Sequence, residues 1–428
     1  MTKQQDEPLI RQLTVTGIWL LAVNGFIGAG IFGSPAEVAR LTGVWSPMMF
    51  AGCGLLMLAV ILCFAELSSY FKNTGGPILY ARTVFGPFVG FQTGWAFYVA
   101  RLTAYAANLN LLIATLGYFN EDLATGTSRI ILIFVVCAFL AWINVIGTKR
   151  AMSSVGILTV LKFLPLLLLI GFGLSEINTD ILPTMQSTLP DYTNVGTAAL
   201  LVIYAFVGWE AAVIPAGETK NPSKTIPVAL LLALLTVTLL YVLIQFVSLS
   251  AVPDLANSAR PLVEAADNLM GPAGAILLTL GIIVSVGGNI ASNVITTPRI
   301  TYAMAREENL PAWFGDVNDK YRTPQNSIIF FCVVVFLLSV YGSFVILAAL
   351  SALTRILIFL LCVFCIPWVR KHRASEHSFQ LPGGLLIPII AVVVCLWLLS
   401  SVSLSSWIPS LIFLSIGTVL YFIMQRIK

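Results

Sequence analysis

Charged side chains are scarce in this sequence. Asp, Glu, Lys and Arg make up 10% of its 428 residues, whereas hydrophobic residues make up 58%. Soluble domains usually contain about 25% charged and about 45–50% apolar residues, so this composition excludes a soluble globular protein. A helix needs roughly 20 apolar residues to cross a bilayer, and the hydrophobic content suffices for roughly twelve such helices. The composition therefore predicts an all-α integral membrane protein.

Motifs of catalysis and metal binding are also missing. The sequence has no H-E-x-x-H and no G-x-S-x-G, and its apolar segments hold no polar His and Ser pair and no paired Asp set. The two histidines, His372 and His377, lie in a basic loop without further metal ligands. All seven cysteines lie in apolar runs, which favours packing over disulfides or zinc. We expect no enzyme, no metal and no cofactor, and the net charge of +4 is too small to indicate nucleic acid.

What the sequence does have is long hydrophobic runs. Breaks at glycine, proline and charge clusters divide them into twelve segments, and the first continues past the length of a signal peptide, so we expect it to be retained. The segments are 14–40, 46–71, 87–117, 128–147, 153–176, 195–217, 227–251, 271–306, 326–342, 344–369, 385–402 and 405–425.

The basic residues predict the orientation of these segments. If the N-terminus is cytoplasmic, sixteen of the 23 Lys and Arg residues fall in cytoplasmic loops and tails. Only Arg40, Arg129 and Arg260 fall outside, and Arg101, Lys162, Arg299 and Arg355 fall within segments. By the positive-inside rule, both termini are predicted to be cytoplasmic in a multi-pass protein of the inner, cytoplasmic membrane.

Glycine and proline interrupt the first segment. Four glycines and Pro35 follow Asn24 within twelve residues. The run from Gly28 to Gly33 matches G-x-G-x-x-G, but residues 44–65 contain no carboxylate and the flanks are apolar, so a dinucleotide site is rejected. A break here would free backbone groups at the bilayer midplane, and these must line a polar cavity or ligand site. Close helix packing through glycine is the alternative.

The sixth segment is interrupted in the same way. Gly208, Glu210 and Pro215 disturb an otherwise apolar helix, five segments after the first break. Five spans followed by five give two halves of opposite orientation, and paired broken helices in such repeats indicate a transporter site. We therefore predict a 5+5 inverted repeat with the first and sixth helices broken. The predicted units are the tail 1–12, the repeats 13–176 and 177–376, and residues 377–428 with two accessory helices.

Four blocks of this sequence resemble the amino acid–polyamine–organocation (APC) superfamily of permeases, whose fold is the ten-plus-two arrangement of LeuT. The resemblance in sequence runs from Leu13 to about Ser327. The last hundred residues match the family only in their hydropathy. The blocks are Gly28-Ala29-Gly30-Ile31-Phe32, Gly75–Arg82 with Gly86–Trp95, Gly217–Pro222 with Ile226-Pro227, and Arg299–Arg306 with Leu310-Pro311. The first corresponds to the broken helix of the family.

This resemblance implies roles for two ionisable residues within the membrane. Lys162 looks like the lysine that occupies, in several relatives, the cation site that sodium fills in sodium-coupled members; it can exchange a proton or serve as a permanent tether. Glu210 resembles an acidic residue of exchangers for cationic substrates; a substrate contact, a proton acceptor and an ion pair remain open. Arg101 could pair with Glu210 or Glu66, while Glu66 and Arg299 fit structural or gating ion pairs.

The resemblance also suggests a substrate pocket around the two breaks. A substrate carboxylate would meet N–H groups around residues 29–31, and its amino group would meet carbonyls of both breaks. Tyr204 and Phe206 resemble aromatic gates, although core packing explains them too. Asn289 and Asn293 share a helical face, for which interhelical hydrogen bonding is the alternative. The full candidate set is Ile27, Gly28, Ala29, Gly30, Ile31, Tyr105, Tyr204, Ala205, Phe206, Gly208, Trp209, Asn289 and Asn293, with Lys162 and Glu210 for coupling.

We therefore expect an amino acid permease that works by alternating access, independent of sodium and coupled to protons. The alternative is an antiporter that exchanges amino acids or polyamines without net proton movement. A channel or a substrate-sensing receptor is the alternative of another class. The expected partners are a small-molecule amino acid or amine, the proton and membrane lipid, without nucleic acid.

Overall fold

The computed structural model describes residues 11–71, 73–146, 155–175, 187–372 and 379–427, with side chains described from Lys162 in the segment that begins at 155. Helices dominate this part of the chain, which contains no named β-strand. The first repeat predicted from the sequence lies in α1 (Val15–Phe26), α2 (Ala29–Gly33), α3 (Pro35–Thr42), α4 (Ser46–Tyr70), α5 (Gly76–Phe85), α6 (Pro87–Leu116), α7 (Gly126–Ile146) and α8 (Val155–Leu174).

The remaining helices are α9 (Tyr192–Ala205), α10 (Pro222–Ala251), α11 (Pro261–Thr296), α12 (Pro298–Arg306), α13 (Gln325–Tyr341), α14 (Phe344–His372), α15 (Leu386–Ser400) and α16 (Leu404–Ile427). Several begin with proline, whose missing N–H costs nothing in the first helical turn. The helix α11 begins ten residues before the expected segment 271–306 and bends at Gly271, which has a φ of +68°. The expected segment starts at Gly271 because Gly271 and Pro272 divide the sequence there, and the ten residues before them include two carboxylates.

Eight helical stretches of the described residues are long and apolar enough to cross a membrane, and four more are apolar but shorter. The eight are Val15–Gly33, Pro35–Tyr70, Pro87–Leu116, Gly126–Ile146, Pro222–Ala251, Pro261–Arg306, Phe344–His372 and Leu404–Ile427. The four are Lys162–Leu174, Tyr192–Ala205, Gln325–Tyr341 and Leu386–Ser400. Together they make this a multi-pass membrane protein.

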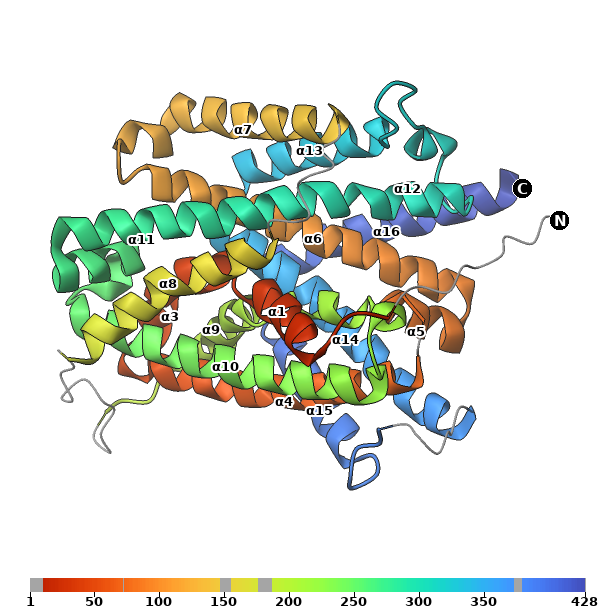
Figure 1. Cartoon of the computed structure of the whole chain (residues 1–428), viewed down its shortest axis with the longest axis horizontal. Helices are drawn as coiled ribbons and strands as arrows, with labels where there is room; N and C mark the ends of the chain where they lie inside the picture. The colour runs from red at the N-terminus through yellow and green to blue at the C-terminus, as the bar shows by residue number, and fades with distance from the viewer. Residues whose placement is uncertain (1–10, 72, 147–154, 176–186, 373–378, 428) are drawn as a thin grey trace.

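The two interrupted helices lie at the centre of the helical bundle. In Figure 1, α1 lies between α11 on one side and the pair α4 and α10 on the other. The helix α10 packs against both α1 and α4, and α14 crosses behind α1 and contacts α6 and α9. The breaks are therefore surrounded by helices from both halves of the chain.

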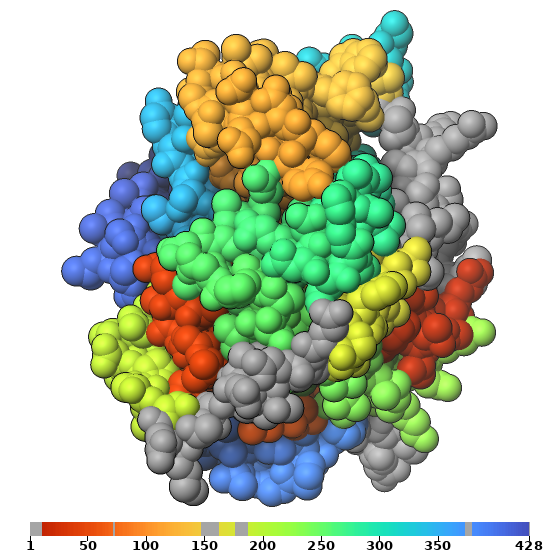
Figure 2. Space-filling model, turned by 90° about the vertical axis from the view of Figure 1, so that its left-hand side faces the viewer, coloured from red at the N-terminus to blue at the C-terminus, as the bar shows by residue number. Residues whose placement is uncertain are grey.

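Ion pairs join neighbouring segments at each end of the bundle. At the end drawn on the right of Figure 1, the guanidinium of Arg82 in α5 lies 3.3 Å from the Glu307 carboxylate after α12. At the opposite end, Arg260 before α11 lies 3.9 Å from Glu121 before α7. Figure 2 views that opposite end and shows the green residues near the start of α11 next to the orange residues of α7. Arg82, expected on the inside, and Arg260, expected on the outside, thus belong to ion pairs at opposite ends of the molecule.

Candidate functional site

The first interruption occupies two residues. The helix α1 ends at Phe26, and Gly28 adopts an extended conformation before α2 begins at Ala29. The first turn of a helix leaves N–H groups without intrahelical acceptors, so the start of α2 presents such donors at the residues 29–31 expected to bind a carboxylate. Because Ser34 keeps helical backbone angles, α3 follows α2 with almost no change of backbone conformation.

The second interruption depends on a glycine. The helix α9 ends at Ala205, and Gly208 has a φ of +108°, which L side chains rarely adopt. The chain then continues as 3₁₀ turns, η4 (Trp209–Val213) and η5 (Ala216–Glu218). Within the apolar segment 195–217, the α-helix therefore ends at Ala205, earlier than the hydropathy suggests.

The two interruptions touch each other. A Cβ atom placed on Gly25 would overlap with the carbonyl group of Gly208, and one placed on Gly30 would overlap with the backbone of Ala205. Only glycine allows two backbones to approach this closely. The segment before α1 also contacts the end of the second interruption. The main-chain N–H groups of Gln12 and Leu13 donate to the Glu218 carbonyl at 2.9 and 3.0 Å. The two broken helices are thus in direct backbone contact.

A tyrosine that sequence reasoning missed joins the two breaks. The hydroxyl oxygen of Tyr241, in α10, lies 2.9 Å from the Phe26 carbonyl oxygen and 3.1 Å from that of Ala205. A hydroxyl has a single hydrogen to donate, so it satisfies one of these carbonyls at a time. The only sequence signal for Tyr241 was a phenol in an apolar span, and many buried tyrosines share that signal.

Lys162 reaches the first break from α8. Its ammonium donates to the side-chain oxygen of Asn24 at 2.8 Å and to the Ile27 carbonyl oxygen at 3.3 Å. The residue is 3% exposed, and both acceptors are neutral. The structure therefore places Lys162 at the carbonyls of the broken first helix, and Asn24 is a partner that sequence reasoning did not include.

Glu210 lies in a buried ion pair beside the second break. One carboxylate oxygen accepts from Arg355 Nε at 2.7 Å, and the other accepts from the Gly208 N–H at 2.7 Å. The Arg355 side chain is 7% exposed and that of Glu210 is 2% exposed. Glu66 instead pairs with Arg370 through two hydrogen bonds of 2.6 and 2.7 Å.

Arg101 therefore pairs with neither of the carboxylates considered for it, and both alternatives were wrong. Its guanidinium donates to the Thr296 hydroxyl at 3.1 Å and lies 4.8 Å from the centre of the Phe97 ring. Glu210 and Glu66 are engaged by other arginines, Arg355 and Arg370. The ion pair expected for Arg299 is also not found in the described part of the chain, where its side chain donates to the Ile295 carbonyl.

Aromatic candidates pack closely around the breaks. Phe206 meets Phe26 edge to face at 6.2 Å between ring centres and Tyr241 at 5.2 Å. The Tyr204 hydroxyl donates to the Asn108 side chain at 3.3 Å. Trp209 stacks on Phe359 in α14, 5.5 Å between ring centres. Apart from Tyr204, which is 6% exposed, these candidates are fully enclosed.

The polar candidates on α6 and α11 differ from one another. Asn289 faces the first break, since a Cβ on Gly28 would lie 2.9 Å from its amide nitrogen. Asn293 instead donates to the Asn289 carbonyl at 3.0 Å, within its own helix. Tyr105 is 1% exposed and packs on Phe331, and its hydroxyl has no partner among the described residues. Of these three, only Asn289 is in place beside a break.

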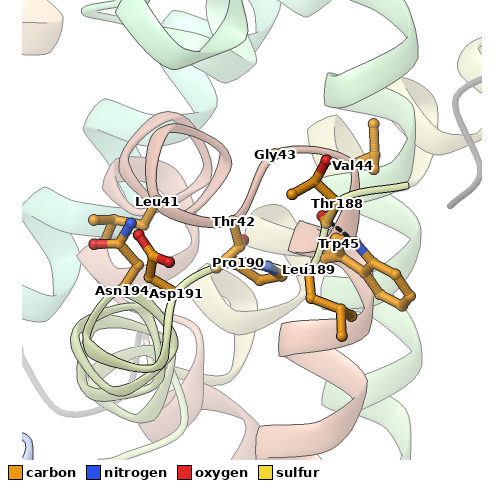
Figure 3. Close-up of a pocket in the computed structure, with 10 residues that line it drawn as sticks. All are labelled: Leu41, Thr42, Gly43, Val44, Trp45, Thr188, Leu189, Pro190, Asp191 and Asn194. Carbon is orange, nitrogen blue, oxygen red and sulfur yellow. Dashed lines mark hydrogen bonds between the residues drawn. The ribbon is translucent and has the colours of Figure 1, made fainter. Parts of the chain in front are cut away.

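A separate hollow lies away from the breaks (Figure 3). It has a volume of about 350 Å³ and is lined by residues 41–45, at and after the end of α3, and by residues 188–191 and Asn194, before and within the first turn of α9. The Trp45 indole donates to the Thr188 carbonyl at 3.1 Å across it. None of the candidate site residues lines this hollow, which lies where the chain connects helices.

Comparison with known proteins places this geometry in a family. The amino acid permease family model matches residues 13–424. The chain is 30% identical to the serine/threonine exchanger SteT of Bacillus subtilis, covering 93% of this chain and 92% of the relative. It is 26% identical to the branched-chain amino acid permease BcaP of the same species, covering 98% and 94%, and 25% identical to the arginine/ornithine antiporter of Pseudomonas aeruginosa, covering 96% and 90%. The chain therefore belongs to the amino acid permease family of the APC superfamily.

Proposed function

We propose that this protein is a secondary active transporter that moves amino acids across the cytoplasmic membrane by alternating access, without sodium and with proton coupling. The observation that carries the proposal is the direct contact between the two breaks, with Lys162 bonded to the first of them. Unwound backbone at membrane depth is tolerated where it lines a site, and paired broken helices are the usual place of a transporter site. Family membership supports the same function.

The proposed architecture has twelve spans with both termini cytoplasmic. The first five spans and the next five form inverted repeats, residues 13–176 and 177–376, followed by two accessory spans in 377–428. The boundaries near 176 and 376 lie outside the described residues. The matching positions of α2 after the first break and η4 after the second support this arrangement.

The substrate would lie where the two breaks meet. Its carboxylate would bind the N–H groups at the start of α2, which lack helical acceptors. Its ammonium would bind the carbonyls of Phe26 and Ala205, of which the Tyr241 hydroxyl can serve only one at a time. Tyr204 and Phe206 would close over the side chain, and Asn289 would border the site from α11. Tyr105, Gly208 and Trp209 would form the layer behind it.

Exchange without net proton movement is the second candidate function. The contacts of Lys162 favour it in one respect, because hydrogen bonds to two neutral oxygens, of Asn24 and Ile27, suit a fixed tether between helices. Two of the relatives named above are also an exchanger and an antiporter. Uptake driven by an imposed pH gradient, without any amino acid inside the vesicle, separates the two functions.

A thermal-shift screen tests the binding function. Ligands that bind the folded state raise its stability according to their concentration and affinity. We expect one group of the twenty amino acids to raise the unfolding temperature of the detergent-solubilised protein, while polyamines do not. Stabilisation by polyamines alone, or by no amino acid, would contradict the proposed substrate class.

A further inference from the structure

The acidic side chain beside the second break is already occupied by a basic side chain of the protein. Arg355 holds one oxygen of Glu210, and the Gly208 N–H holds the other, each at 2.7 Å. Arg355 is in turn fixed by the Ala100 carbonyl at 3.3 Å and by the Ser351 hydroxyl. Glu210 is therefore a neutralised and immobilised group, and it offers no free charge to a cationic ligand.

Basic groups exceed acidic ones around the two breaks. Arg355 bonds to the Ala100 carbonyl, and the next residue, Arg101, donates to the Thr296 hydroxyl. Among the described side chains, no carboxylate forms an ion pair with Arg101 or with Lys162. Two cationic groups, Lys162 and Arg355, and one carboxylate, Glu210, therefore bond to residues of the two breaks, and Glu210 neutralises only Arg355.

This excess of positive charge acts differently on the classes of amino acid. Charges interact strongly where water is largely excluded, so a cationic side chain would be repelled and would find no free carboxylate. An amino acid with an uncharged side chain has an ammonium and a carboxylate that cancel, and both meet complementary backbone groups at the breaks. Specificity of this kind arises from repulsion of the wrong ligand as much as from attraction of the right one.

We propose that the Arg355–Glu210 ion pair is a specificity element that makes this carrier select amino acids with uncharged side chains and reject those with cationic side chains. This inference rests on the proposed function. An ion pair was one of the three roles left open for Glu210 in the sequence. Family membership does not decide the specificity, because the relatives include both a serine/threonine exchanger and an arginine/ornithine antiporter. The deciding residue is Arg355, in α14.

The first arm of the test uses the wild-type protein. Serine, threonine, leucine, lysine, arginine and ornithine are compared as inducers of a thermal shift and as internal substrates that drive counterflow in proteoliposomes. We expect activity from the uncharged set and none from the cationic set at equal concentration. Equal activity of the cationic set would overturn the inference and leave the proposed function intact. Inactivity of both sets would contradict the proposed function itself.

The second arm changes the ion pair. In Arg355→Gln the carboxylate of Glu210 is freed, and we expect binding of ornithine relative to serine to improve by about tenfold, equal to about 1.4 kcal/mol. Arg355→Lys should keep the wild-type preference, and the double variant Arg355→Gln with Glu210→Gln should lose the gain. A folded Arg355→Gln protein with unchanged preference would overturn the inference. If that variant does not fold, the wild-type comparison decides alone.

Discussion

The ammonium of Lys162 lies 2.8 Å from the side-chain oxygen of Asn24, and it fastens α8 to the first broken helix. The same ammonium lies 3.3 Å from the carbonyl oxygen of Ile27, the residue that follows α1. If α1 moves, then either α8 moves with it or the hydrogen bonds of Lys162 break. This relationship makes Lys162 the natural point at which to test coupling.

Replacing Lys162 by alanine should abolish proton-coupled uptake. The change leaves Asn24 and the Ile27 carbonyl without their donor, at a cost of about 1–3 kcal/mol in stability. Uptake in proteoliposomes should fall at least about tenfold, and the remainder should not depend on the pH gradient. The matched control is Lys320→Ala, an exposed lysine outside the spans, which should behave as wild type. Residual uptake with unchanged proton dependence would reduce Lys162 to a tether.

Gly30→Val should abolish uptake while leaving membrane insertion intact. A Cβ at this position would overlap with Ala205, so the two breaks could not keep their contact. Gly52→Val is the matched control, because Gly52 lies within α4 with no atom within 4 Å of a built Cβ. Both variants are assayed for membrane insertion by surface labelling and for uptake. Normal transport by correctly inserted Gly30→Val would show that the site lies elsewhere.

Removing the hydroxyl of Tyr241 should destabilise the protein. Tyr241→Phe leaves the Phe26 and Ala205 carbonyls without a side-chain donor, and a buried unsatisfied group costs about 1–3 kcal/mol. We expect a lower unfolding temperature and slower uptake. Tyr105→Phe is the control, since the Tyr105 hydroxyl is buried without a partner among the described residues. Its loss should not lower stability, and a drop equal to that of Tyr241→Phe would contradict the account.

Glu66→Gln should lower stability more than it lowers the affinity for substrate. Glu66 is fully buried, pairs with Arg370 and also accepts from the Leu381 N–H at 3.1 Å. Because Arg370 is partly exposed, we expect a loss of about 2 kcal/mol, below the range for a fully buried pair. The control is Glu307→Gln, whose pair with Arg82 is exposed and should contribute about 0–1 kcal/mol. Equal losses in the two variants would contradict this ranking.

The sequence predicted the breaks well because glycine and proline act locally. The interruption after Phe26 follows from residues that sit within a few positions of it, and Gly208 has a φ that favours glycine. The pairing of side chains between helices could not be predicted in this way. Arg355 and Glu210 are 145 residues apart in the chain, and composition or spacing gives no reason to choose Arg355 over Arg101. Tyr241 was missed for the same reason, since its partners belong to two other helices.

The length of elements was less predictable than their presence. Hydropathy does not register a change from α-helix to 3₁₀ turns, so the segment 195–217 read as a single span although α9 ends at Ala205. In α11 the opposite happened, because Gly271 and Pro272 suggested a boundary where the helix only bends, and the helix begins ten residues earlier. Each difference occurs at a glycine with a positive φ, Gly208 in the segment 195–217 and Gly271 in α11.

Counterflow in proteoliposomes tests the central claim most directly. Vesicles loaded with an unlabelled amino acid are diluted into the same labelled amino acid, and wild type is compared with Gly30→Val and Gly52→Val. A carrier with its site at the two breaks should show saturable, transient accumulation of label in wild type and in Gly52→Val, and none in Gly30→Val. A flux that rises linearly with concentration without accumulation, or accumulation preserved in correctly inserted Gly30→Val, would contradict the account.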